Sequence, residues 1–173
     1  VGGGTVWASC VMTATNAFAP NENFGGFSLF DSGNEQVLMG LTAYEANNGK
    51  YGLKRIGQAP DQNFADSVVP GPEPALLVYR FDFPATNGGP VAVTFYANPT
   101  LGPTAPVTPT GTASVNNFTF NSIRIACDNN MVLDELRLGA TWLAVTPFIA
   151  NPSITQISPT QVQISWSTNA VGT

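Results

Sequence analysis

Val132-Leu133-Asp134-Glu135-Leu136-Arg137-Leu138-Gly139-Ala140-Thr141-Trp142 is the stretch of sequence that decides the fold. Side chains alternate along a β-strand, which places Asp134 on an apolar face with Val132, Leu136 and Leu138. The stretch therefore predicts a strand with one carboxylate on its apolar face, followed by a glycine turn and a Trp anchor. Because a carboxylate among apolar side chains must be satisfied by hydrogen bonds, we expect Asp134 to be a buried structural carboxylate, held by backbone N–H groups or a cation.

The same period of two recurs in segments separated by Gly, Asn and Pro. Residues 76–83 form the clearest expected strand, and residues 91–96 are expected to pair with it across a glycine turn. Another hairpin is expected across Asp31-Ser32-Gly33-Asn34. Further strands are expected at residues 5–13, 27–30, 36–39, 51–56 and 118–125, the last with a bulge at residues 121–122. About eight strands with short turns predict an all-β antiparallel two-sheet sandwich.

Four segments of the chain resemble the concanavalin A-like (laminin-G-like) jelly rolls of bacterial secreted or surface proteins. They are Thr5-Val6-Trp7-Ala8-Ser9, residues 77–83, Tyr96-Ala97-Asn98-Pro99, and the Asp134 strand with the Val145-Thr146-Pro147 that follows it. The resemblance covers residues 5 to 147 and implies a jelly-roll sandwich in a first domain, residues 1–148. That superfamily includes lectins, glycan-binding modules, adhesive repeats and glucanases, so the resemblance leaves the activity open.

The last segment, residues 149–173, resembles the first two strands of a fibronectin type III or immunoglobulin-like module. Two strands cannot bury their own apolar face. The side chains expected to need cover are Ile154, Val162, Ile164 and Trp166. We therefore expect this C-terminal β extension to dock on a neighbouring subunit or module, by adding a strand to an open sheet edge, or else on its own sandwich.

Composition favours an extracellular or cell-surface protein. Charged residues make up only 10% of the chain, against about 25% in typical globular proteins. The net charge is −5 and no basic cluster occurs, which argues against a nucleic-acid partner. No apolar run approaches the roughly 20 residues of a membrane span, so no membrane insertion is expected. The chain starts at Val1 without a signal peptide, as expected of a processed product or an excised piece.

Catalysis is not expected, and no catalytic residue or resident cofactor is predicted. The glucanase branch of the resembled superfamily carries a Glu-x-Asp-x-x-Glu strand, and no such pattern occurs here. Retaining glycosidases need two carboxyls about 5–5.5 Å apart, whereas Asp134 and Glu135 are consecutive and would point to opposite faces. The chain contains no His, which excludes His-dependent triads and His metal sites.

Two kinds of ligand remain as candidates. Calcium needs several oxygen ligands. Asp128-Asn129-Asn130 offers such a cluster, and Asp31 with Asn34 and Glu35 offers another. For both clusters the alternative is that these residues only form ordinary turns. Glycan binding needs exposed aromatic rings. The candidates are Tyr44, Phe64 and Trp142, and for Trp142 the alternative is packing over the sandwich edge.

Two covalent modifications are also candidates. Cys10 and Cys127 either form a disulfide between an early and a late strand or remain two buried thiols. The uncharged segment 99–114 is expected to be a long surface loop, in which Thr104, Thr108 and Thr110 lie next to prolines. That composition suits O-glycosylation, and an unmodified loop is the alternative.

Two functions fit these observations. The first is a non-catalytic structural or adhesive module of a bacterial surface, filament or matrix protein, self-assembling by strand exchange. Its partners would be copies of itself or adjacent modules of a larger protein. The alternative is a lectin-like carbohydrate-binding module that is accessory to polysaccharide degradation.

Overall fold

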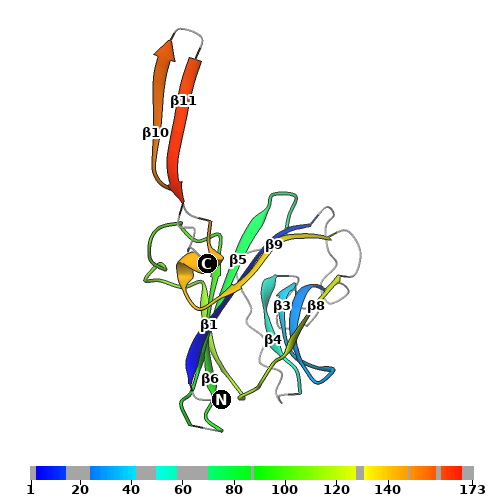
Figure 1. Ribbon diagram of the computed structural model, residues 1–173. Helices are drawn as coiled ribbons and strands as arrows, with labels where there is room; N and C mark the ends of the chain where they lie inside the picture. Colours follow the sequence, from blue (N-terminus) through cyan, green and yellow to red (C-terminus); the bar gives the residue numbers. More distant parts are fainter. Residues whose placement is uncertain are drawn as a thin grey trace.

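The computed structural model describes residues 3–14, 24–41, 50–57, 70–86, 88–127, 131–147, 149–158 and 161–168, with the backbone alone described at 14, 127 and from 149 onward. A five-stranded antiparallel sheet has the order β7-β6-β5-β1-β9 (Figure 1). Its strands are β1 (Gly4–Ala14), β5 (Ala75–Phe83), β6 (Val91–Ala97), β7 (Gly111–Val115) and β9 (Met131–Gly139).

A four-stranded antiparallel sheet, of order β4-β3-β2-β8, forms the second layer. Its strands are β2 (Gly25–Asp31), β3 (Asn34–Leu41), β4 (Tyr51–Arg55) and β8 (Ser122–Cys127). The chain also contains a short helix α1 (Trp142–Val145) and a pair of strands, β10 (Ile149–Ser158) and β11 (Gln161–Thr168), that form a two-stranded sheet of their own. The all-β sandwich predicted from the sequence is confirmed.

The core lies between the two sheets and follows the predicted alternation. The buried side chains of the central strands include Ala8, Cys10 and Met12 on β1, Leu77, Tyr79 and Phe81 on β5, Phe27 and Leu29 on β2, and Val37 and Met39 on β3. The predicted hairpins are also confirmed. Residues 31 and 34 pair across a turn in which Ser32 and Gly33 have positive φ, and β6 pairs with β5.

Three local predictions are wrong. Residues 118–120 are not part of a bulged strand; they belong to the connection from β7 to β8, and Phe118 packs edge-on against Phe81 in the core. Residues 111–114 belong to β7 rather than to a surface loop. Helix α1 was not expected; the Thr141 side chain caps it by accepting a hydrogen bond from the backbone N–H of Ala144.

Strand β9 contains a bulge that changes which side chains face the core. Ser9 of β1 pairs with Arg137, but Val11 pairs with Asp134, so β9 has one extra residue at this point. Glu135 adopts the left-handed region, with φ 53°. The bulge reverses the alternation, so that Leu133 and Leu136 both pack on the core.

The expected burial of Asp134 is therefore wrong. Its side chain is exposed, and its Oδ1 accepts a hydrogen bond from the backbone N–H of Glu135 inside the bulge. Val132, expected on the same apolar face, is 55% exposed. Asp134 stabilises a local turn of the backbone rather than a buried network.

Glycines meet across two strands of the four-stranded sheet. Gly26 pairs in register with Gly40, and both have positive φ. A Cβ at Gly26 would lie 1.9 Å from the carbonyl oxygen of Met39, and one at Gly40 would lie 2.4 Å from that of Gly25. A side chain at either position would overlap the backbone of the neighbouring strand.

A second apolar cluster covers part of the outer face of the five-stranded sheet. The rings of Trp7 and Tyr96 stack at 6.3 Å between centroids, and Trp142 of α1 lies edge-on to both at 5.6 Å. The indole N–H of Trp142 donates to the carbonyl oxygen of Gly102, which holds the loop after β6 against the helix. Val78 and Val145 complete this outer cluster.

Candidate functional site

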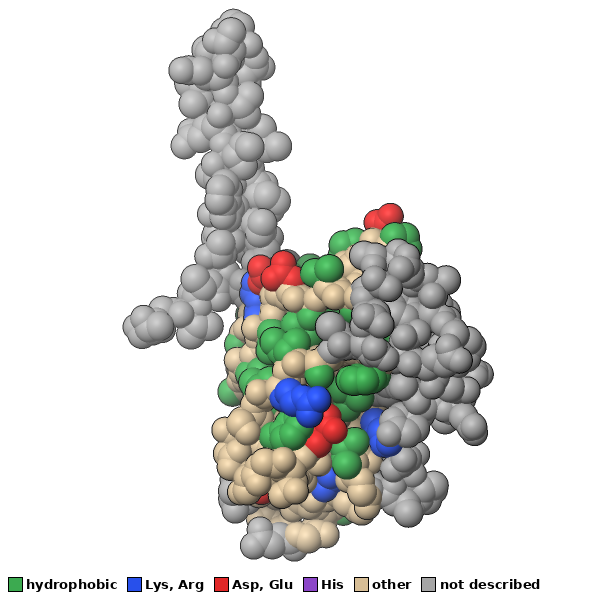
Figure 2. All heavy atoms as spheres, turned by 90° about the vertical axis from the view of Figure 1, so that its right-hand side faces the viewer, with side chains coloured by type: hydrophobic (Ala, Val, Ile, Leu, Met, Phe, Trp, Pro, Cys, Tyr) green, Lys and Arg blue, Asp and Glu red, His purple; other side chains and the backbone are tan. Residues whose placement is uncertain are grey.

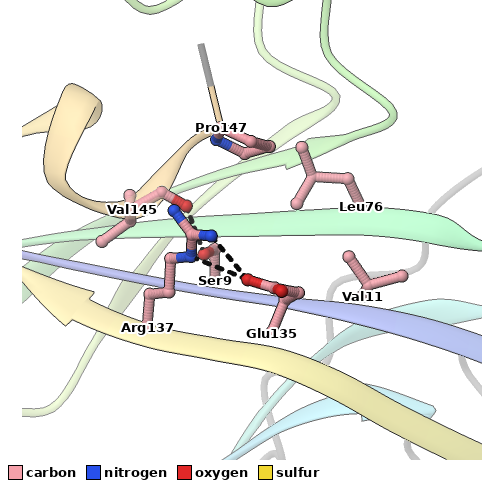
Figure 3. A pocket seen from close by; sticks show the side chains of 7 residues that line it. All are labelled: Ser9, Val11, Leu76, Glu135, Arg137, Val145 and Pro147. Atoms are coloured by element: carbon pink, nitrogen blue, oxygen red, sulfur yellow. Dashed lines mark hydrogen bonds and ion pairs between the residues drawn. The ribbon is translucent and has the colours of Figure 1, made fainter. Parts of the chain in front are cut away.

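A cavity of about 280 Å³ lies on the outer face of the five-stranded sheet, beside the outer cluster (Figure 3). Strands β1, β5 and β9 and the end of α1 surround it. The lining residues are Ser9, Val11, Leu76, Glu135, Arg137, Val145 and Pro147. The bulge in β9 places Glu135 at this cavity.

The polar groups of this cavity bind one another. The guanidinium of Arg137 forms an ion pair with the carboxylate of Glu135, and the Ser9 hydroxyl donates to the carbonyl oxygen of Val145. The Glu135 side chain is 56% exposed and that of Arg137 is 38% exposed, so water screens the pair and it stabilises the fold little. The remaining lining is apolar. The cavity suits an apolar side chain better than a charged ligand.

A second feature is the edge of the four-stranded sheet at β8. Ile125 pairs with the buried Phe27, and Ile123 pairs with the buried Leu29. Residues opposite each other in an antiparallel pair share one face, so both isoleucines face the interior side of the sheet. They are nevertheless 43% (Ile123) and 56% (Ile125) exposed. Figure 2 shows hydrophobic side chains, in green, at the surface on this side of the molecule.

Strands β8 and β9 follow each other along the chain. Three residues separate their ends, and each is one of the two edge strands of its sheet. We call the exposed isoleucines of β8, together with the edge of that strand that has no partner strand among the described residues, the open flank. Alternation along the strand puts the apolar Ile123 and Ile125 on one face, but the position of β8 at a sheet edge depends on strand order, which the sequence does not show.

The candidate disulfide is not formed. Cys10 is a free cysteine, completely buried on β1, where it pairs with Leu77 of β5. Burial raises the pKa of its thiol from 9.0 to about 12. Cys10 is therefore a buried thiol, as in the second of the two alternatives. The side chain of Cys127 lies outside the described residues.

The structure also corrects one glycan-contact candidate. Trp142 is only 5% exposed, so it offers no ring face for stacking on a sugar; its ring packs edge-to-face with Trp7 and Tyr96, and its N–H donates to Gly102. The alternative, packing over the sandwich, is confirmed. Tyr44 and Phe64 lie outside the described residues.

The calcium candidates receive no support. Asp128, Asn129 and Asn130 lie outside the described residues. In the second candidate group, the carboxylate of Asp31 accepts hydrogen bonds from Ser32, Thr119 and Asn121, and Ser28 donates to Glu35. No group of three acidic, Cys or His side chains that could hold a metal occurs in the part of the chain that the structure describes.

The three candidate O-glycosylation sites are at the surface. Thr104, Thr108 and Thr110 are all exposed in the loop between β6 and β7. The hydroxyl of Thr110 accepts a hydrogen bond from the backbone N–H of Ala97, which fixes the end of the loop. Exposure is a condition for modification, and the modification itself stays a prediction.

Among the described residues, no helix is both long and apolar enough to cross a membrane. Comparison with known proteins adds no family: no family model, no curated protein and no solved structure matches this chain.

Proposed function

We propose that the protein is a non-catalytic structural module of a bacterial surface, filament or matrix protein, which assembles with copies of itself or with adjacent modules through its C-terminal hairpin. The observation that carries this proposal is that β10 and β11 pair with each other in a separate two-stranded sheet. A hairpin of two strands is at best marginally stable alone in water. Covering its apolar face would therefore stabilise it substantially.

The composition of the hairpin supports this role. Residues 138–173 contain no Asp, Glu, Lys or Arg. In β11, Val162, Ile164 and Trp166 alternate with Gln and Ser, a pattern that places the apolar residues on one face. Proteins commonly protect exposed strands from pairing with other chains by charges on the strand. Strand β11 has no such protection, as expected of a strand that pairs.

The composition of the chain and the polar groups of its cavity support a non-catalytic module outside the cell. Charged residues are 10% of the total, and His, the side chain most used for acid–base chemistry near neutral pH, does not occur. In the cavity on the outer face, Arg137 and Glu135 already pair with each other, and the Ser9 hydroxyl is bound to the carbonyl oxygen of Val145 in the same chain. These observations favour a module that contacts other proteins.

Sedimentation of the full chain over a range of concentrations tests the proposal. We expect the wild-type chain to self-associate and Ile164→Lys to weaken association at least about tenfold, because a Lys on the apolar face would have to be buried. Gln163→Glu is the control, since it adds a charge to the other, polar face of β11, and it should associate as the wild type does. A wild-type chain that stays monomeric at every concentration, or equal association by both variants, would contradict the proposal.

A further inference from the structure

The open flank is a sheet edge without the usual protection against pairing. Strand β8 contains no Pro or Gly, has one charge, Arg124, and pairs with β2 without a register shift. Its interior-facing Ile123 and Ile125 remain in contact with water. A strand added at this edge would satisfy the free backbone groups of β8 and cover both isoleucines.

The other three edge strands are less suited to receive a strand. Strand β9 is bulged at Glu135 and has three charged side chains, Asp134, Glu135 and Arg137, features that block edge pairing. Strand β7 has only five residues, and its Thr112 and Ser114 are small, polar and exposed. Strand β4 also has five residues, and Tyr51 to Lys54 are buried.

The C-terminal hairpin offers one strand whose pattern complements β8. Strand β11 has eight residues without Pro, Gly or charge. Beside β8, its Val162, Ile164 and Trp166 would continue the apolar face of Ile123 and Ile125, and its Gln and Ser residues would face outward beside Arg124. Strand β10 is a poorer donor, because Pro152 lacks an N–H and two register shifts interrupt its pairing.

The point where the hairpin is attached favours a second copy as the donor. Pro147 lines the cavity on the outer face of the five-stranded sheet. Only Phe148 separates Pro147 from the start of β10, and one residue spans at most about 3.6 Å. Strand β8 belongs to the other layer, and packed sheets lie about 10 Å apart. The hairpin thus starts on the far side of the sandwich from the edge that it would fill.

We propose that β11 of one copy adds to the free edge of β8 in a second copy, with Val162, Ile164 and Trp166 covering Ile123 and Ile125. This assignment rests on the proposed function and names the acceptor surface. Donor and acceptor are different surfaces of one chain, so the contact is head-to-tail and repeats along a row of copies unless a rotation closes it into a ring.

One pair of substitutions tests the acceptor in the full chain. Ile125→Lys places a charge on the open flank, and Val132→Lys places one on the neighbouring edge β9 at a side chain of equal exposure, 56% against 55%. We expect Ile125→Lys to weaken self-association at least about tenfold, and Val132→Lys to leave it within about twofold. Thermal unfolding of both variants checks that the fold is intact.

A cross-linking experiment keeps the assignment testable if a Lys at position 125 unfolds the domain. Ile125→Cys and Ile164→Cys are made in separate chains that also carry Cys127→Ser, and the two chains are mixed with a short bis-maleimide. We expect cross-linked pairs of unlike chains, and few when Val132→Cys replaces Ile125→Cys. Cys10 is buried and should not react.

The outcomes separate the two proposals. Suppose that the wild-type chain associates, that Ile125→Lys and Val132→Lys weaken association equally, and that position 125 forms no cross-link. This result would overturn the β8 acceptor and leave the proposed assembly function intact. A monomeric wild-type chain would overturn both. Cross-linking of positions 125 and 164 within one doubly substituted chain at high dilution would show docking on its own sandwich and overturn the second copy.

Discussion

The two faces of the five-stranded sheet are buried by different means. The inner face packs on the four-stranded sheet, and its side chains come from strands that alternate regularly, such as Tyr79 and Phe81 on β5. The outer face is covered by aromatic residues from three distant segments, Trp7, Tyr96 and Trp142, and only over part of its area. Where this cover ends, the cavity beside Val11 and Leu76 begins.

This difference shows that one face of the sheet stabilises the fold while the other positions the segments packed on it. The inner core supplies most of the apolar burial, which stabilises the fold roughly in proportion to its area. The outer cluster mainly fixes the position of α1 and of the loop at Gly102, and it thereby fixes the point from which the C-terminal hairpin leaves the sandwich. Changes to the two faces should accordingly have different sizes and different consequences.

The largest effect is expected in the inner core. Phe81 is completely buried and packs against the ring of Phe118 at 5.9 Å between centroids. Phe81→Ala should lower the free energy of unfolding by about 3–5 kcal/mol, through lost burial and the cavity left behind. Urea denaturation measures this loss. Thr112→Ala, at an exposed position on β7, should change stability by less than about 0.5 kcal/mol, and an equal loss in both variants would contradict the comparison.

A smaller effect is expected where α1 meets β9. A Cβ at Gly139 would lie 2.5 Å from the Cβ of Ala144, so any side chain must displace the helix. Gly139→Val should lower the free energy of unfolding by about 1–3 kcal/mol and loosen the loop at Gly102, measured by limited proteolysis. Gly71→Ala is the control, because a Cβ there has no neighbour within 4 Å. A Gly139→Val variant as stable and protease-resistant as the control would show that α1 does not depend on this contact.

The smallest effect is a dependence on alkaline pH that distinguishes the two faces. On the inner face, burial raises the pKa of Cys10 from 9.0 to about 12. On the outer face, burial raises the pKa of Tyr96, and the charge of Arg80 opposes that rise. Because only the folded state raises the pKa of Cys10, the unfolded chain loses the Cys10 proton at lower pH than the folded chain does. The stability from the buried neutral thiol is complete below pH 9 and is lost as pH rises toward 12.

At pH 10 the loss assigned to Cys10 should be on the order of 1 kcal/mol. Urea denaturation of the wild type and of Cys10→Ala at neutral pH and at pH 10 measures it, since the variant lacks the thiol. The wild type should lose more stability than the variant between the two conditions. Equal losses would show that the thiol of Cys10 is not kept neutral by burial.

The regular strands could be predicted from the sequence because their alternation is uninterrupted. Strand β5 has apolar and charged residues on opposite faces, as expected, and the turn at Ser32 and Gly33 was recognised from its residue types. Strand β9 could not be predicted in the same way. Its alternation reverses at Glu135, and Glu is not a residue type that marks a left-handed conformation. Asp134 was therefore assigned to the wrong face.

The site residues depended on arrangements that are not local. The outer cluster joins residues 7, 96 and 142; the 132–142 stretch indicated that Trp142 anchors the fold, but no single segment indicates that Trp7 and Tyr96 are its partners. The surroundings of Cys10 also depend on strand pairing, because its neighbour Leu77 comes from β5, and the structure has Cys10 as a free, buried cysteine. Helix α1 has four residues, too few for a helical period, and only Thr141 as a capping residue could have indicated it.

The paired glycines of β2 and β3 have a consequence for the mutational tolerance of the domain. Surface-facing positions of a strand usually accept many residue types, and interior positions few. Alternation alone would place Gly26 and Gly40 on the outer side of their sheet, but both are buried with positive φ, and each has backbone atoms where a Cβ would be. A Cβ at Gly40 would also lie 3.0 Å from the Sδ of Met12, a core side chain of the opposite sheet. A scan of all substitutions should therefore find Gly26 and Gly40 intolerant, as constrained as the phenylalanines of the core.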